Sequence, residues 1–208
     1  MTKQNILYQG AEAIIQVSTY LERSVVEKRR LHKRYRLPTI DTRLITFRTK
    51  EEAKLMKEAR HQGVCVPLIY DVDLTQGIIT MEYVQGQRVK DIFNDLPSEQ
   101  QIQLCREIGE NIAKLHNHDI IHGDLTTSNM ILRDDHLYFI DFGLGEQNSE
   151  IEAKGVDLHV LMEAMESTHS AYASRFIDVL EGYRQKLTSN PQQVIEKIQD
   201  IVKRGRYR

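Results

Sequence analysis

The sequence is poor in cysteine and has no long apolar run. Its 208 residues include two cysteines, Cys65 and Cys105, and both lie in apolar stretches. This spacing supports neither a disulfide framework nor a zinc site, so we expect two small buried thiols in a reducing cytoplasm. No apolar run approaches the roughly 18 to 20 residues that a membrane span needs, and no signal peptide is apparent at the start. We therefore expect a cytoplasmic protein.

The chain also lacks internal repeats, low-complexity segments and a strong net charge. The formal net charge is -2, which alone implies no attraction to nucleic acid or to a membrane surface. Basic residues nevertheless cluster at 28–36 and again at 203–208. The length and the 40% of hydrophobic residues allow one compact domain or two small lobes with a real core.

Two short apolar runs, at 130–132 and 137–140, flank a polar turn, and this pattern predicts a hairpin of two short strands. Asp124 and Asn129 precede the first strand, and Asp141 follows the second. Because folding the hairpin brings Asn129 and Asp141 to the same edge, their oxygens suit Mg²⁺, which proteins usually hold with one or two groups plus phosphate oxygens. Asp124 lies on the loop that enters the hairpin, where it can reach a substrate hydroxyl.

This spacing is that of a protein kinase, in which the catalytic-loop acid precedes an asparagine by five residues and Asp-Phe-Gly follows. Here the loop reads His-Gly-Asp-Leu-Thr-Thr-Ser-Asn at 122–129, and Asp-Phe-Gly stands at 141–143. Asp and Asn also favour simple turns, but the joint match in order and spacing disfavours that alternative.

Two features of ordinary protein kinases are missing. Gly123 stands where most of them have an arginine that pairs with a phosphate on the activation loop, which argues against that form of control. The Ala-Pro-Glu motif that ends a long activation segment is also absent, so we expect no peptide-docking platform.

The first third of the chain predicts three strands, at 6–8, 14–19 and 24–28. A turn of small residues at 10–13 joins the first two strands, and its backbone N–H groups could lie over phosphates. The turn is not of the Gly-x-Gly-x-x-Gly form, so an ordinary hairpin is the alternative. Its position upstream of the other motifs favours the phosphate role.

Lys28 ends the third predicted strand. In kinases such a lysine contacts the α- and β-phosphates and pairs with an acid on the next helix. Three other basic residues compete for this role, and strand alternation does not choose among them: Arg29, Arg30 and Lys33. Pro38 should halt regular structure, and a helical pattern follows Asp41, with Glu51 or Glu52 near its middle as the expected partner.

A strand at 78–84 stops before Gln-Gly-Gln at 85–87, which looks like the hinge between two lobes. The backbone around Met81, Glu82 and Tyr83 would then meet the adenine edge. A long helix, with Ser98 and Gln101 as a capping box, then delivers the chain to the catalytic loop. Asp157 either holds that loop through its backbone or caps a helix that begins at Gly155, and the sequence does not decide between these roles.

These motifs resemble the small atypical kinase of the KEOPS (EKC) complex, a relative of the RIO kinases, over essentially the whole chain. The resemblance rests on Gly-Ala-Glu-Ala at 10–13, Tyr-Arg-Leu-Pro at 35–38, Arg-Thr-x-x-Glu-Ala at 48–53, the loop at 122–129, Asp-Phe-Gly-Leu at 141–144 and Arg-Gly-Arg-Tyr-Arg at 204–208. In this alignment Lys28 matches the nucleotide lysine of the family and Glu52 matches its helix partner.

The resemblance implies ATP and Mg²⁺ as cofactors, ATP hydrolysis and serine/threonine autophosphorylation, in a protein of archaeal type. It also implies membership of the complex that supports threonylcarbamoyl-adenosine formation in tRNA. The implied partners are the threonylcarbamoyl-transferase subunit and a small subunit that docks on the amino-terminal lobe. The basic tail of this family is implicated in tRNA contact.

The fold predicted is α+β, a minimal two-lobed protein-kinase-like fold with an amino-terminal lobe at 1–84, a carboxy-terminal lobe at 85–202 and a basic tail at 203–208. The residues assigned are Asp124 for catalysis; Asn129 and Asp141 for the metal; Gly10, Ala11, Glu12, Ala13, Lys28, Glu52, Met81, Glu82 and Tyr83 for the nucleotide; and Arg204, Arg206, Tyr207 and Arg208 for tRNA.

Two rival functions remain at this point. Small-molecule phosphotransferases of the aminoglycoside or choline kinase type share His-Gly-Asp and the asparagine five residues later, but they need a helical insert for which this chain has no room. A kinase-shaped scaffold that binds tRNA without catalysis is the other rival, and the intact set of Lys, Glu, Asp, Asn and Asp argues against it.

Overall fold

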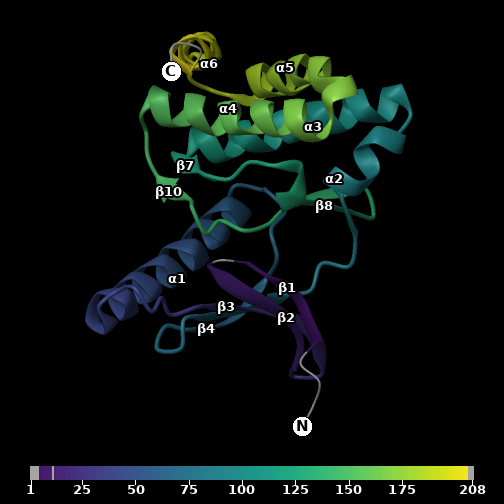
Figure 1. The fold of residues 1–208 in the computed structure, drawn as a ribbon. Helices are drawn as coiled ribbons and strands as arrows, with labels where there is room; N and C mark the ends of the chain where they lie inside the picture. The colour runs from purple at the N-terminus through teal and green to yellow at the C-terminus, as the bar shows by residue number, and fades with distance from the viewer. Residues whose placement is uncertain (1–4, 11, 206–208) are drawn as a thin grey trace.

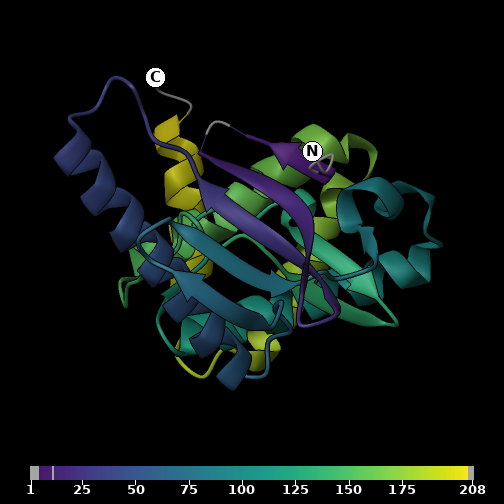
Figure 2. The same ribbon diagram turned by 90° about the horizontal axis from the view of Figure 1, so that it is seen from below.

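The computed structural model describes residues 5–10 and 12–205, and it consists of a sheet-rich part and a helical part (Figure 1). The sheet has five antiparallel strands in the order β1-β2-β3-β5-β4. Its strands are β1 (Asn5–Gln9), β2 (Ala13–Tyr20), β3 (Arg23–Arg30), β4 (Ile69–Asp73) and β5 (Ile78–Glu82). The long helix α1 (Pro38–His61) connects β3 to β4 and lies beside the sheet at one edge of the molecule (Figure 2).

The helical part follows the sheet and contains two small sheets. Its helices are α2 (Val89–Ile92), α3 (Ser98–Asn117), α4 (Ile151–Thr168), α5 (Phe176–Lys186) and α6 (Pro191–Gly205), with 3₁₀ turns η1 (Phe93–Asp95), η2 (Thr127–Asn129) and η3 (Ser170–Arg175). Strands β6 (Gln87–Arg88), β8 (Met130–Arg133) and β9 (His136–Phe139) form one sheet, and β7 (Ile120–Ile121) pairs with β10 (Glu146–Gln147) in the other. Among the described residues, no helix combines the length and apolar character that crossing a membrane requires.

Three predicted helix starts differ from the structure. α1 begins at Pro38 itself, because proline is tolerated in the first turn and Leu37 before it is extended. Ser98 does not cap α3, since it is already the first helical residue and its hydroxyl accepts from Arg175. Gln101 instead donates its side-chain amide to the carbonyl of Phe93, 3.0 Å away, so the predicted capping box is wrong. α4 begins at Ile151 rather than at Gly155.

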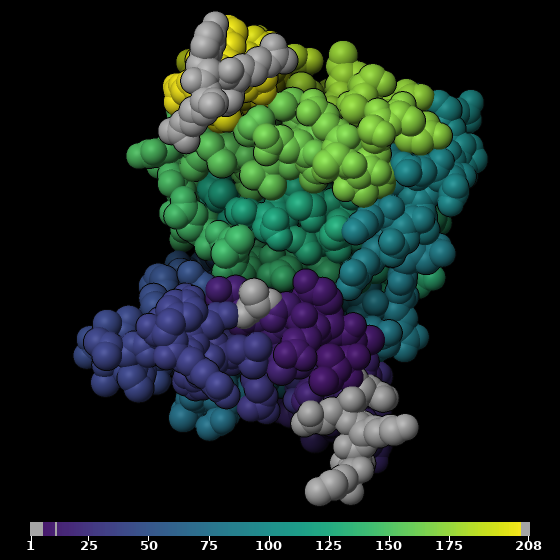
Figure 3. Space-filling model, in the orientation of Figure 1, coloured from purple at the N-terminus to yellow at the C-terminus, as the bar shows by residue number. Residues whose placement is uncertain are grey.

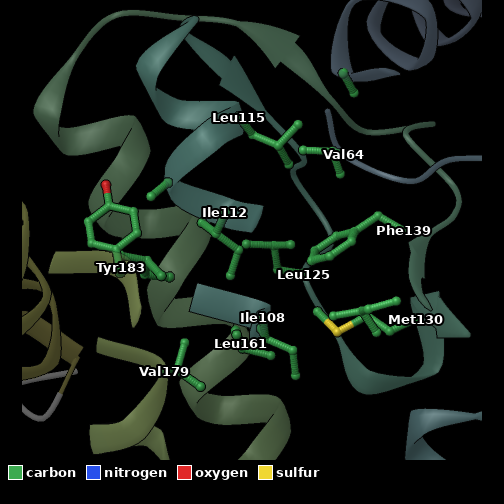
Figure 4. Packing of buried hydrophobic residues seen from close by; sticks show 14 of the residues in the cluster. Val64, Ile108, Ile112, Leu115, Leu125, Met130, Phe139, Leu161, Val179 and Tyr183 are labelled. Carbon is green, nitrogen blue, oxygen red and sulfur yellow. The ribbon is translucent and has the colours of Figure 1, made fainter. Parts of the chain in front are cut away.

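One hydrophobic core runs from α1 through the hairpin to α5. Figure 4 shows Leu125 of the catalytic loop between Ile112 of α3 and Phe139 of β9. All three side chains have no solvent exposure, and full burial of such a side chain contributes about 1.5–3 kcal/mol. The loop is therefore attached to the core by its own leucine. Of the two predicted buried thiols, Cys105 is buried and Cys65 is only partly buried.

Helices α3 and α5 cross at backbone contact because each has a glycine at the crossing. A Cβ on Gly109 would lie 1.9 Å from the carbonyl oxygen of Val179, and one on Gly182 would lie 2.0 Å from the carbonyl oxygen of Arg106. Backbone atoms inside helices cannot move aside locally, so any larger residue must push the two helices apart. This crossing sets how closely the carboxy-terminal helices pack against α3.

Gly109→Ala is therefore expected to lower the free energy of unfolding by about 3 kcal/mol, measured by urea denaturation, through overpacking. The control is Gly155→Ala in α4, where the nearest atoms belong to the side chain of Lys197, which can shift. The control should lose clearly less stability. Equal losses in the two variants would contradict the backbone-contact explanation.

Candidate active site

A cavity of about 670 Å³ lies between the sheet and the helical part. Lys28 and Met81 line it from the sheet, while Asp124, Asn129 and Asp141 line it from the catalytic loop and the end of the hairpin. The predicted catalytic and metal residues thus converge on one cavity, although 113 positions of sequence separate Lys28 from Asp141.

The predicted hairpin is confirmed as β8 and β9. Met130 pairs with Phe139 and Arg133 with His136, around a two-residue turn in which Asp134 and Asp135 have φ of 48° and 62°. Positive φ at both positions is typical of the type I′ turn that matches strand twist. Beyond the paired strands, the Ile140 N–H donates to the carbonyl of Asn129 at 2.9 Å, so Asn129 and Asp141 come to one edge.

Asn129 is oriented by Asp124. Its Nδ2 donates to Asp124 Oδ2 at 2.8 Å and to the Asp124 carbonyl at 2.9 Å. The amide nitrogen is thereby committed, and the other polar atom of the side chain is an oxygen, the donor type that Mg²⁺ prefers. The same contact holds the Asp124 carboxylate at the cavity.

Asp141 adopts a backbone conformation that is uncommon for a residue with a side chain, with φ of 64°. Its Oδ1 accepts from Lys28 Nζ at 2.6 Å and from the Gly143 N–H at 3.1 Å. Burial alone would raise the pKa of Asp141, but the Lys28 ammonium and these hydrogen bonds lower it below the ordinary value. Asp141 is therefore a carboxylate at neutral pH, as a metal ligand must be.

Glu52 lies between two cations. Lys28 Nζ is 2.6 Å from its Oε1, and Arg30 Nη2 is 2.6 Å from its Oε2. Burial lowers the pKa of Lys28, but Glu52 and Asp141 outweigh it and raise the pKa above the ordinary value. The strand alternation left Lys28 and Arg30 as competitors, whereas the structure uses both, because residues two apart in β3 share a face.

The second cation matters for the buried carboxylate. Glu52 is 1% exposed, and a buried charge that loses its partner is strongly destabilising. Because Arg30 holds one oxygen of Glu52, Lys28 can turn toward a phosphate without leaving Glu52 unpaired. The pairing of Glu52 with Arg30 was missed at the sequence level, although the spacing of Arg30 from Lys28 was a signal for it.

Asp157 holds the catalytic loop, which decides between its two predicted roles. Its Oδ2 accepts from the His122 N–H and its Oδ1 from the Gly123 N–H, each at 2.9 Å. His116 Nε2 lies 3.2 Å from Oδ2 and its Nδ1 lies 2.9 Å from the Tyr183 hydroxyl, so the carboxylate is itself fixed. Asp157 lies in the interior of α4 rather than at its start.

The structure also explains the glycine in the loop. Gly123 has φ of +79°, and a Cβ there would lie 2.2 Å from the carbonyl oxygen of Leu144. An arginine at this position would require a different path for the chain after Asp-Phe-Gly. The missing arginine is thus a consequence of close backbone packing.

His122 is buried and links the loop to the hairpin. Its Nε2 lies 3.1 Å from the Ile140 carbonyl, and its Nδ1 lies 3.3 Å from the Asp124 N–H. Burial lowers the pKa of His122, so the imidazole is neutral, donating from Nε2 and accepting at Nδ1. Its contacts position the backbone on both sides of the site.

The predicted small-residue turn lies between Tyr8 and Ile15, which line the cavity, but is itself not part of the wall. Of its described members, Gly10, Glu12 and Ala13, none lines the cavity, and Ala11 lies outside the described residues. The Gly10 N–H donates to the Ala13 carbonyl at 3.0 Å, and Glu12 pairs with Arg48 of α1 at 2.9 Å. A phosphate contact by this turn remains a prediction.

The predicted hinge residues do line the cavity. Met81, Glu82 and Tyr83 all contribute to its wall. The Glu82 N–H donates to the Leu68 carbonyl at 2.7 Å, and the Glu82 carboxylate accepts from Arg133 at 2.7 Å. A contact of this stretch with adenine would therefore need polar groups other than these two.

The predicted tail starts inside a helix. α6 extends to Gly205, so Lys203 and Arg204 form its last turn, and Arg204 pairs with Glu152 of α4 at 2.9 Å. The boundary expected at 203 therefore does not coincide with the end of regular structure. Arg206, Tyr207 and Arg208 lie outside the described residues.

Within the described part of the chain, no three His, Cys, Asp or Glu residues are grouped so that they could hold a metal ion. An ion at Asn129 and Asp141 would therefore complete its shell with phosphate oxygens and water, as Mg²⁺ commonly does. The donor set fits a magnesium-nucleotide rather than a metal bound by protein alone.

Comparison with known proteins finds relatives that agree with the resemblance seen in the sequence. A family model of the RIO domain matches residues 13–154. The KEOPS complex subunit Bud32 of Pyrococcus abyssi is 47% identical over 211 residues, which cover 98% of this chain and 96% of that protein. A probable bifunctional tRNA threonylcarbamoyladenosine biosynthesis protein of Methanobrevibacter smithii is 44% identical over 98% of this chain, which spans only 37% of that longer protein.

A solved structure shares the fold. The Rio2 kinase of Chaetomium thermophilum, in a complex with ADP, Mg²⁺ and phosphoaspartate, superposes with a TM-score of 0.64 at 16% identity. The match covers 97% of this chain and 70% of that one. The predicted two-lobed protein-kinase-like fold is thereby confirmed.

The hold of Asp157 on the loop predicts a pH dependence of stability. Burial raises the pKa of Asp157, but His116 and the loop N–H groups lower it below the ordinary value. A lowered pKa adds stability above the ordinary value near pH 4, and this stability is lost as pH falls through the folded-state pKa. Asp157→Asn should cost about 3 kcal/mol at pH 7, and less below about pH 4.

Urea denaturation of Asp157→Asn and of the unmodified protein from pH 3 to pH 7 measures the difference in their free energies of unfolding. The control is Asp95→Asn, an exposed carboxylate of η1, which should leave the curve unchanged. A difference between Asp157→Asn and the unmodified chain that stays constant down to pH 3 would show that the ionised carboxylate does not provide the stability.

Proposed function

The chain belongs to the RIO-domain family, and from this premise we propose that it is an ATP-dependent atypical serine/threonine kinase and ATPase that supports tRNA modification. The observation that carries the proposal is the convergence of Asp124, Asn129 and Asp141 with Lys28 at one cavity between the sheet and the helical part. Such a set positions a nucleotide and neutralises its phosphates, which is most of what phosphoryl transfer requires.

In this proposal Asp141 and Asn129 hold Mg²⁺, which when bound neutralises charge on the ATP phosphates. Lys28 leaves Asp141 and turns to the phosphates, while Arg30 keeps Glu52 paired. Asp124 orients the oxygen of a water or of a serine or threonine hydroxyl in line with the γ-phosphate and accepts the proton of that oxygen. His122 and Asp157 keep the loop that carries Asp124 in place.

The names of the relatives support the setting of the reaction. One is a KEOPS complex subunit, and the other is named for tRNA threonylcarbamoyladenosine biosynthesis. We accordingly propose that this chain works in the cytoplasm beside a threonylcarbamoyl-transferase subunit and a small subunit on its sheet-rich lobe. The end of α6 with Arg204, followed by Arg206, Tyr207 and Arg208, is the proposed tRNA contact of the tail.

The lobes proposed at 1–84 and 85–202 meet at the cavity in this scheme, with Met81 to Tyr83 beside the adenine. The rival small-molecule phosphotransferases need a helical insert for their substrate. If the protein consumed ATP only when amino sugars or choline were added, the result would favour that rival.

Asp124→Ala should lower ATP turnover by about 10² to 10⁴, the usual contribution of a positioned general base. Nucleotide affinity should change little, because Lys28 and Asp141 remain and Asn129 keeps its hydrogen bond to the backbone carbonyl at position 124. ADP release and calorimetric binding of Mg²⁺-ADP measure the two quantities separately. Asp95→Ala serves as the exposed-carboxylate control, and undiminished turnover in Asp124→Ala would remove Asp124 from the reaction.

Asp141→Ala should instead weaken the binding of the nucleotide in a magnesium-dependent way. The unmodified chain is expected to bind ADP more tightly with Mg²⁺ than with a chelator, and the variant should lose this difference. Calorimetry with and without the chelator makes the comparison. A preserved magnesium effect in Asp141→Ala would place the metal elsewhere.

A further inference from the structure

The outer side of α1 carries a row of four basic side chains and one aromatic side chain. Arg43, Phe47, Lys50, Lys54 and Lys57 recur at intervals of four, three, four and three residues, which puts them on one face of a helix. All five are exposed. The row extends about 21 Å along the axis, at 1.5 Å per residue. We call these five residues the basic α1 face.

The cations of this face are not paired with carboxylates. Of the four carboxylates of α1, Asp41 and Glu52 are buried, while Glu51 and Glu58 are partly buried at the edge of the row, three residues before and four residues after Lys54. Across the part of the chain that the structure covers, Arg43, Lys50 and Lys57 have no hydrogen-bond or ion-pair partner, and Lys54 donates only to the neutral amide of Gln147. Within the described residues, none of these four cations has a carboxylate partner in an ion pair.

An ordinary solvated helix face does not account for this pattern. Such faces usually mix charges of both signs, often as pairs three or four residues apart. Here the exposed aromatic ring of Phe47, 62% of whose surface is accessible, lies within the row of cations. An exposed aromatic among cations that form no ion pair is typical of a surface that binds nucleic acid.

The loop that leads into α1 adds a second exposed aromatic side chain, beside a cation that is held by a carboxylate. Buried Asp41 accepts from His32 Nδ1 at 2.8 Å, from the Lys33 N–H at 3.1 Å and from Arg36 Nη1 at 3.3 Å, which gives the loop a defined shape. Tyr35 is 78% exposed, and the Arg36 guanidinium lies 5.3 Å from the centre of its ring. The loop thus presents an aromatic ring and a cation at the start of α1.

The position of α1 leaves this surface accessible to a large partner. Figures 1 and 2 place α1 at one edge of the molecule, with its amino-terminal half projecting past the sheet. In Figure 3 the corresponding segment forms a protruding edge of the sheet-rich part. Glu52 lies on the opposite side of the same helix and faces the active site, so the outer face is free of any role in the proposed chemistry.

We propose that the basic α1 face and Tyr35 form an RNA-binding surface, in which the cations contact phosphates and the aromatic rings stack on unpaired bases. Charge complementarity selects a polyanion, and the exposed rings favour RNA over an acidic protein. Contacts to phosphates carry no sequence information, so binding is expected to be largely independent of sequence. The identification of this RNA as tRNA rests on the proposed function.

The experiment measures binding of an unmodified tRNA transcript by fluorescence anisotropy at several salt concentrations. Lys50→Gln combined with Lys57→Gln should weaken binding on the order of tenfold and reduce the slope of log K against log salt by about 1.5 to 2, because two phosphate contacts are lost. Lys50→Arg with Lys57→Arg keeps the charge and should restore both values.

The matched control is Arg184→Gln with Lys186→Gln on α5, two exposed cations whose loss changes the net charge equally. Tyr35→Ala with Phe47→Ala should weaken binding about tenfold without changing the salt slope, because stacking releases no counterions. Thermal unfolding of each variant verifies that it is folded.

Equal salt slopes for the α1 and α5 double variants would overturn the proposal. Binding of polyglutamate is measured on the same variants. If Lys50→Gln with Lys57→Gln lost polyglutamate binding but kept RNA binding, the proposal would also be overturned, because the face would then bind an acidic protein. ATP turnover measured on the same samples keeps the two hypotheses apart. Turnover without α1-dependent RNA binding refutes this surface alone, and α1-dependent RNA binding without turnover refutes the proposed function alone.

Discussion

The buried carboxylate of Glu52, held between Lys28 and Arg30, is the interaction on which the site depends. Taking such an ion out of water costs several kcal/mol unless partners compensate it, and β3 supplies the compensating cations, of which Arg30 stays when Lys28 turns to a phosphate. Lys28 also pairs with Asp141, which extends the network to the hairpin. The sheet, α1 and the helical part are therefore joined at the cavity where the nucleotide is proposed to bind.

A second buried carboxylate performs the corresponding task in the helical part. Asp157 fixes the backbone at His122 and Gly123, and Leu125 anchors the same loop in the core. The loop is thus held at its start and at its middle by contacts that do not themselves take part in chemistry. Buried ion pairs and hydrogen bonds thus hold the side chains that line the cavity. One side of α1 contributes to this site, and its opposite side is proposed to bind RNA.

Much of the site could be predicted because its determinants are local. The hairpin follows from two apolar runs around a polar turn, and this places Asn129 and Asp141 together. The helix with Glu52 follows from its apolar pattern. The starts of α1 and α3 were misjudged, because a proline or serine near a helix start is equally compatible with neighbouring positions, and α4 begins at Ile151, before the predicted Gly155. Backbone hydrogen bonds decide the start, as at Pro97, whose carbonyl accepts from Gln101.

The order and spacing of the motifs, the strand and helix patterns and the family membership were determined by the sequence alone, since each depends on residues near one another in the chain. Only the tertiary structure decided that Arg30 shares Glu52, that Asp157 binds the loop, and that Gly123 packs against Leu144. These contacts join residues 22, 35 and 21 positions apart on different elements. Their formation depends on how the elements pack, because a side chain can pair only with the groups that packing brings within hydrogen-bond distance.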